Sequence, residues 1–212
     1  MTCKFCGCGK NIIPVYYQNK KVNSLVHESE NFYVIVSIGA VVEGHLLIIP
    51  KSHYWSMGEL PDELITELSE ITFYIENMLK SEYKKNVICF EHGTGNKESV
   101  SAASVVHAHL HILPISESIT DSVKHEGHRL IPINGFKDLS KYADAGESYL
   151  FFRDIDNKMY CVEGTGLPSQ YFRRIVCETF NMENWDWHHS YNIDNVYHTV
   201  QRLNRSDWTQ KK

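Results

Sequence analysis

The chain has 212 residues, a net charge of −5, and apolar and charged fractions of 42% and 22%, which is typical of one folded domain or one domain with an appendage. No run of five or more basic residues is present, which disfavours a protein that coats nucleic acid. No apolar stretch reaches the length of a membrane span and the N-terminus lacks a secretion signal, so we expect a cytoplasmic or nuclear protein whose six cysteines do not form a disulfide scaffold.

The first half of the chain predicts strands around one long helix. Strands are expected at Asn31–Ile38, Gly44–Pro50 and Asn86–His92, which are rich in β-branched and other apolar residues. A helix is expected at Pro61–Lys85, because apolar residues recur there at three- and four-residue steps behind a proline and two acidic residues. A polar loop with two glycines, Gly93–Ala103, then leads toward the next strand.

That next strand, Val105–Leu113, carries the most informative pattern of the chain. His107, His109 and His111 alternate in it with apolar residues. Side chains of a strand alternate between its two faces, so we expect all three imidazoles on one face. Histidine changes its protonation readily near neutral pH. The pattern therefore predicts a proton-handling, nucleophilic or metal-binding array.

The second half of the chain has weaker patterns. We expect Ser116–Ala145 to be irregular and to lie on the surface. Ser148–Arg153 and Lys158–Glu163 predict a hairpin, and Pro168–Phe180 predicts a second helix. The fold class predicted for the whole chain is α+β, with a mostly antiparallel sheet, a long helix beside it, and a smaller C-terminal α/β appendage.

The N-terminal cysteines form a second chemical motif. Cys3-x-x-Cys6 is a spacing used both by redox pairs and by zinc sites. A thioredoxin-like pair lies between a strand and a helix, and this position does not offer that context. Two thiolates need two further ligands to close a tetrahedral zinc site, and Cys8 offers a third thiol.

The run H-A-H-L-H-I-L resembles the signature of the histidine triad (HIT) superfamily of nucleotide hydrolases and transferases. Supporting segments occur in the same order as in that family: G-H-L-L-I-I-P-K-S-H at 44–53, F-E-H-G at 90–93, and Ser104 three residues before the triad. The resemblance covers roughly residues 3–115. It implies a HIT-like nucleotide-binding catalytic domain at 1–115 and a C-terminal extension at 116–212 that packs on it.

The resemblance also implies site residues. His109 would attack the α-phosphorus of a nucleotide and form a nucleotidyl-histidine intermediate, while His111 and Ser104 would stabilise the phosphate. Ser37 and Glu91 occupy positions expected to contact nucleotide, although Ser37 also fits an ordinary serine at a strand end. Glu91 stands where many relatives have asparagine, and its carboxylate is unfavourable beside phosphates unless it is protonated or turned away.

In zinc-bearing branches of this superfamily, two cysteines join two histidines around a structural zinc ion. The residues of this chain that match those ligands are Cys3, Cys6, His53 and His107. A competing set uses Cys8 in place of one of them.

Three further residues allow two interpretations each. His45 is either a core histidine or a residue close to the site. Arg173 and Arg174 either reach a phosphate or acidic group, or lie on the exposed side of an amphipathic helix.

We therefore expect hydrolysis or nucleotidyl transfer at the α-phosphate of a nucleoside phosphate derivative, with an adenylated compound or a dinucleoside polyphosphate favoured. One alternative is a nucleotide-binding scaffold with weak catalysis. Another is a metal-dependent hydrolase that uses the three histidines as ligands. The expected partners are a nucleotide or nucleotidylated small molecule, with neither a membrane nor nucleic acid, and a homodimer is considered because many relatives form one.

Overall fold

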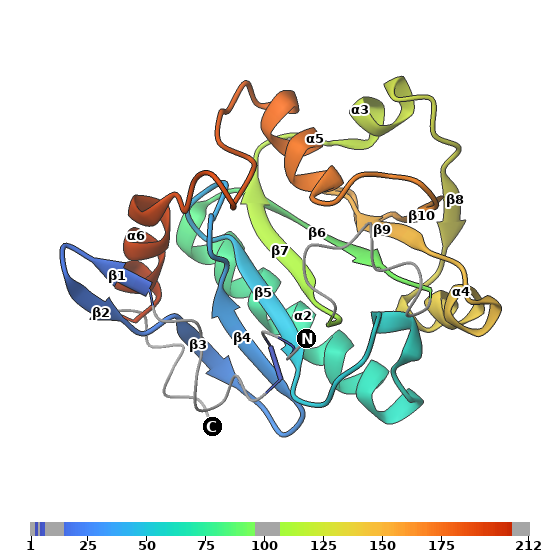
Figure 1. Cartoon of the computed structure of the whole chain (residues 1–212), viewed down its shortest axis with the longest axis horizontal. Helices are drawn as coiled ribbons and strands as arrows, with labels where there is room; N and C mark the ends of the chain where they lie inside the picture. The colour runs from blue at the N-terminus through green and yellow to red at the C-terminus, as the bar shows by residue number, and fades with distance from the viewer. Residues whose placement is uncertain (1–2, 4, 7–14, 96–106, 205–212) are drawn as a thin grey trace.

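The structure is a computed structural model that describes residues 3, 5–6, 15–95 and 107–204. Its centre is an antiparallel sheet with the strand order β3-β4-β5-β7-β6-β9-β10-β8, and β1 and β2 pair in a separate hairpin (Figure 1). The strands are β1 Val15–Tyr17, β2 Lys20–Val22, β3 Leu25–Glu28, β4 Phe32–Val36, β5 Leu46–Pro50, β6 Asn86–Gly93, β7 Leu110–Ile115, β8 Ile131–Ile133, β9 Tyr149–Arg153 and β10 Met159–Glu163. The helices are η1 Met57–Glu59, α2 Asp62–Tyr83, α3 Thr120–His125, η3 Phe136–Leu139, α4 Ser140–Ala145, α5 Tyr171–Thr179 and α6 Ile193–Leu203.

The two faces of the sheet bury different sets of side chains. Helix α2 covers one face, where Leu110 and Ile112 of β7 join its apolar stripe in the main core (Figure 1). The opposite face, which we call the triad face, carries His111, because neighbouring residues of a strand point to opposite sides. Helices α3 and α5 cover part of the triad face and pack on Phe90 and Phe152.

The sheet continues without a break from the first half of the chain into the second. Strand β9 pairs with β6, with Phe90 opposite Phe152, and β10 and β8 extend the sheet beyond it. This arrangement confirms the predicted α+β class with an antiparallel sheet and a long adjacent helix. The proposed division at residue 115 stays a prediction. No helix of the described residues is long and apolar enough to cross a membrane.

Three predicted elements need correction. Strand β7 begins at Leu110, so His107 and His109 precede it and only His111 lies in its regular part. The segment 116–145 is not irregular throughout: it forms α3, β8, η3 and α4, because Val123 and Leu139 are buried and β8 pairs with β10. The long helix ends at Tyr83, since the next residue adopts a left-handed conformation with φ 53°.

Candidate active site and metal cluster

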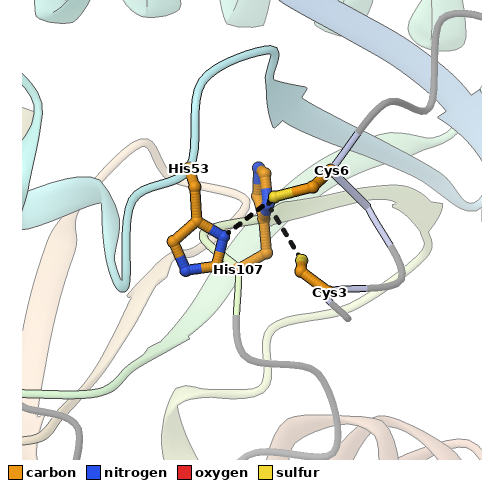
Figure 2. A group of neighbouring side chains, drawn as sticks. All are labelled: Cys3, Cys6, His53 and His107. Carbon is orange, nitrogen blue, oxygen red and sulfur yellow. Dashed lines mark hydrogen bonds between the residues drawn. The ribbon is translucent and has the colours of Figure 1, made fainter. Parts of the chain in front are cut away.

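The structure brings Cys3, Cys6, His53 and His107 together, and one potential ligand atom from each lies within 4.8 Å of the others (Figure 2). The Sγ of Cys3 lies 3.4 Å from Nδ1 of His107, and the Sγ of Cys6 lies 3.2 Å from Nδ1 of His53. A tetrahedral zinc ion with Zn–S bonds of about 2.3 Å and Zn–N bonds of about 2.1 Å separates sulfur from nitrogen by about 3.6 Å. The spacing of these atoms therefore fits such an ion.

The hydrogen bonding of His107 also fits a metal ligand. Its Nε2 lies 2.9 Å from the carbonyl oxygen of Pro50. A carbonyl oxygen only accepts hydrogen bonds, so Nε2 carries the proton and Nδ1 presents its lone pair to the two sulfur atoms. A histidine that binds a metal commonly donates its other N–H to a backbone carbonyl in this way. Burial lowers the pKa of His107 to about 4, which keeps the ring neutral.

His109 lies next to this cluster and has the opposite ring orientation. Its Nδ1 donates a hydrogen bond to the carbonyl oxygen of His107 at 2.8 Å, which leaves a lone pair on Nε2. No described residue forms a hydrogen bond with that nitrogen. Burial lowers the pKa of His109, and the charge of Arg173 lowers it further. Phe5 packs edge-on against the ring, with centroids 5.6 Å apart. The result is a neutral imidazole with an available Nε2.

His111 is held by a second histidine. Nδ1 of His45 accepts the backbone N–H of Val41 at 3.3 Å, so the proton of a neutral His45 ring is on Nε2. That N–H donates to Nδ1 of His111 at 2.8 Å. Burial lowers the pKa of both rings well below the ordinary value, so the proton of neutral His111 is on Nε2. Phe90 stacks on the His111 ring at 4.6 Å and fixes its plane. His111 therefore offers an N–H donor beside His109.

The structure corrects the expectation for Glu91. Strand alternation places its side chain on the face covered by α2, opposite the triad. There the carboxylate accepts the N–H of Met57 at 2.7 Å and the hydroxyl of Tyr149 at 2.6 Å. Burial raises the pKa of Glu91 to about 7. Glu91 is thus the turned-away carboxylate, and the residue that points to the triad face is its neighbour, His92.

Sequence reasoning missed His92. Both of its ring nitrogens are buried and have no hydrogen-bond partner among the described residues. Burial lowers its pKa to about 4, and the nearby His109 adds to the shift. Buried polar groups are nearly always paired, so two unpaired ring nitrogens on this face indicate a place for a ligand. The histidine in E-H-G was visible in the sequence, but the sequence did not show which face of the sheet it points to.

Ser37 lies at the end of β4 and is buried, and its hydroxyl donates to the carbonyl of Ile38 at 3.3 Å. Ile38 lines a cavity of about 1090 Å³, together with Trp187, Tyr191 and other residues of the C-terminal extension. Ser37 thus precedes a residue of the cavity wall, and its backbone N–H donates to the carbonyl oxygen of His45 at 2.9 Å. Ser104 and Cys8 lie outside the described residues.

The two arginines of α5 differ. Arg174 forms exposed ion pairs with Glu126 and Glu178, as expected for the outer side of an amphipathic helix. Arg173 is only 3% exposed; its Nε donates to the carbonyl of Trp185 at 2.9 Å, and its Nη2 donates to the carbonyl of Gly39. Arg174 therefore lies on the exposed side of the helix, as one interpretation expected, whereas Arg173 does not.

The chain is similar to several known proteins. Adenosine 5'-monophosphoramidase HNT1 of Saccharomyces cerevisiae is 30% identical over 112 residues, which cover 53% of this chain and 61% of the relative. CWF19-like protein 1 of Mus musculus is 22% identical over 198 residues, which cover 87% of this chain and 35% of the relative. A crystal structure of a HIT family protein from Bacillus subtilis aligns with a TM-score of 0.43 at 26% identity and covers 54% of this chain and 73% of that one.

The match to the CWF19-like protein extends past the triad, so the C-terminal extension has related sequences as well. The HIT domain family matches residues 18–118, which contain all three histidines of the triad. The chain therefore contains a HIT domain at residues 18–118.

Proposed function

We propose that this HIT-type enzyme hydrolyses, or transfers the nucleotidyl group of, a nucleoside phosphate derivative through a covalent intermediate on His109. The observation that carries the proposal is the hydrogen bond that Nδ1 of His109 donates to the carbonyl oxygen of His107. This hydrogen bond leaves the lone pair of Nε2 available. A neutral imidazole nitrogen is a good nucleophile near neutral pH, and a covalent intermediate divides one difficult displacement into two easier ones.

In the first step, Nε2 of His109 forms a bond to the α-phosphorus, and the bond from phosphorus to the leaving group breaks. The leaving group departs with that electron pair and takes up a proton. In the second step, water attacks the phosphorus and gives up a proton to solvent, which replaces the proton that the leaving group took up, and the P–N bond breaks so that its electron pair returns to Nε2. A phosphate or another acceptor that replaces water makes the same chemistry a transfer.

The neighbouring side chains supply the stabilisation that such a phosphorus centre needs. The Nε2–H of His111 donates to a phosphate oxygen, and the bond from His45 keeps that proton in place. The two unpaired nitrogens of His92 are available to the phosphate or to the leaving group. Ser104 and Ser37 stay predicted contacts of the nucleotide, and Ile38, the neighbour of Ser37, lines the cavity.

An adenylated compound is the favoured substrate, because the matched yeast relative is named as an adenosine 5'-monophosphoramidase. We propose zinc as a structural ion held by Cys3, Cys6, His53 and His107, since two thiols and two imidazoles are a donor set that zinc prefers. Such an ion would fix the segment that carries His109 without an open coordination position. The predicted homodimer stays a prediction.

Geometry disfavours the alternative of a catalytic metal bound by the three histidines. Nδ1 of His107 faces the cysteines, Nδ1 of His109 bonds to a carbonyl, and Nδ1 of His111 bonds to His45. These three rings therefore have different partners instead of one common centre. The alternative of a nucleotide-binding scaffold with weak catalysis is disfavoured as well. Binding alone does not require a neutral His109 with an available Nε2 lone pair.

The direct test is a turnover screen with adenosine 5'-phosphoramidate, a diadenosine polyphosphate and a uridylylated sugar, with products identified by mass. We expect the wild type to release AMP from an adenylated substrate. His109→Ala should lower kcat by more than about a thousandfold. His198→Ala changes an exposed histidine on α6 and should leave turnover unchanged. Equal turnover by wild type and His109→Ala would contradict the proposal.

A further inference from the structure

The C-terminal extension places a buried cation at the triad face. Phe172 of α5 packs on Phe90 with ring centroids 5.2 Å apart, and Phe90 stacks on His111. The next residue, Arg173, is bonded on one side to the carbonyl of Trp185 and on the other to the carbonyl of Gly39. Two separate segments of the chain thus fix the guanidinium, and β6 connects its helix to the triad.

Arg173 has no acidic partner for its charge. No carboxylate of the described residues forms an ion pair with it. The acidic residue that influences it, Asp186, accepts hydrogen bonds from Gln170 and His188 instead. A guanidinium has five N–H donors, and Nη1 has no hydrogen bond to any residue in the described part of the chain.

A comparison within the same protein shows that this arrangement is unusual. Arg153 and Arg173 are the buried cations among the described residues. Arg153 lies on the α2 side of the sheet and forms an ion pair with Glu76 at 2.5 Å. A buried charge without a counter-charge costs several kcal/mol, so proteins rarely keep one without a reason. Burial lowers the pKa of Arg173 to about 10, and its charge lowers the pKa of His45, His109 and His111, as expected for a cation near all three rings.

We propose, on the basis of the function proposed above, that Arg173 binds the phosphate group of the nucleotide substrate. Its ligand is a phosphate ester or phosphoramidate anion, which supplies the missing negative charge and accepts hydrogen bonds from Nη1 and the remaining N–H of Nη2. A planar guanidinium fixed by two hydrogen bonds is preorganised to bind phosphate oxygens. Its positive charge stabilises the negative charge of those oxygens while the phosphorus is attacked.

This assignment gives the C-terminal extension a role in the site. The described lysines of residues 18–118 are all at least partly exposed, and Lys51 and Lys80 pair with glutamates. The cation for the phosphate therefore comes from α5, outside the HIT domain itself. Among the described residues of the HIT domain, the donors that face the phosphate beside the histidines are neutral.

The test compares the dissociation constants of AMP and adenosine by isothermal titration calorimetry. Two variants change Arg173, to Gln and to Lys. Arg174→Gln is the matched control, because it removes the neighbouring arginine on the same helix, whose ion pairs are exposed. Thermal unfolding is measured for each variant, so that loss of folding is recognised.

We expect Arg173→Gln to weaken AMP binding by about tenfold to a hundredfold while adenosine binding changes less than about twofold. Arg173→Lys keeps the charge but loses the planar fork, so we expect it to weaken AMP by about tenfold relative to adenosine. Arg174→Gln should change neither constant.

A purely structural tether between Gly39 and Trp185 predicts that the Arg173 variants weaken both ligands equally, and this result would overturn the inference. A wild type that binds adenosine as tightly as AMP would overturn it as well. If the wild type binds neither AMP nor UMP, the proposed function itself fails. If the wild type binds AMP and the Arg173 variants bind it equally well, only the role of Arg173 fails.

Discussion

On the α2 face of the sheet, the buried charged groups have partners within the protein. Glu76 pairs with Arg153, and Glu91 accepts hydrogen bonds from Met57 and Tyr149. On the triad face, the polar groups are only half satisfied. Within the part of the chain that the structure describes, the ring nitrogens of His92 are unpaired and Arg173 lacks a counter-charge.

The difference between the two faces separates structural from functional polar groups. Internal pairing serves the stability of the fold, because each group compensates another. Incomplete pairing costs stability and is expected where a ligand completes it.

The largest effect on stability is expected from the metal cluster at the end of the triad face. Cys6→Ser should lower the free energy of unfolding by more than about 5 kcal/mol and reduce bound zinc, because the proposed ion would link Cys3 and Cys6 to the core. Cys161→Ala, which changes a buried thiol elsewhere, should keep one equivalent of zinc. Elemental analysis and urea unfolding measure both. Wild-type protein without zinc after purification in the absence of chelator would contradict this prediction.

The next effect concerns the buried ion pair of the α2 face. Glu76→Gln leaves Arg153 buried without its carboxylate and should cost about 3–5 kcal/mol of unfolding free energy. Glu126→Gln breaks the exposed pair with Arg174 and should cost less than about 1 kcal/mol. Urea unfolding of both variants tests the comparison, and equal losses would show that burial does not distinguish these pairs.

Glu91 predicts a dependence of stability on pH. Its folded-state pKa is about 7 and therefore lies above the ordinary value of 4.5, so the folded protein holds this proton more tightly than the unfolded chain. The stability associated with the neutral carboxyl is complete below about pH 4.5 and is lost as the pH rises to about 7, by up to about 3 kcal/mol. Glu91→Gln cannot ionise, so its stability should fall less over this range. The free energy of unfolding is measured by urea unfolding at each pH. If it falls equally with pH in the wild type and in Glu91→Gln, the raised pKa of Glu91 is contradicted.

The smallest effect concerns the bond from His45 to His111. His45→Leu removes the donor and leaves Nδ1 of His111 unpaired, which should lower kcat by about tenfold with little change in KM. His45→Gln keeps an N–H donor and should recover part of this loss. If both variants lower kcat equally, His45 acts only as a packing residue.

The sequence predicted the elements with strong local patterns. The helix at Pro61–Lys85 and the hairpin at Ser148–Arg153 and Lys158–Glu163 agree with α2, β9 and β10 to within a few residues. The attachment of β9 to β6 was not predicted, because pairing between distant strands has no local signature.

The same limit applies to the site. Strand periodicity suggested three equivalent histidines, but His107 and His109 precede β7 and take their orientation from Pro50 and from the chain itself. The pairing of His107 with Cys3 and Cys6 followed from family resemblance and not from periodicity. The burial of Arg173 depends on Gly39, 134 residues away, so the sequence left its role undecided.

The nucleophilic role of His109 is tested most directly by acid-sensitive adduct trapping. Wild-type enzyme is mixed with an adenylated substrate, denatured within the first turnover at neutral pH, digested and analysed by tandem mass spectrometry. We expect one adenylyl group on His109, released by mild acid and absent from His109→Ala. Turnover without any such adduct, or an adduct on another residue that persists in His109→Ala, would contradict it.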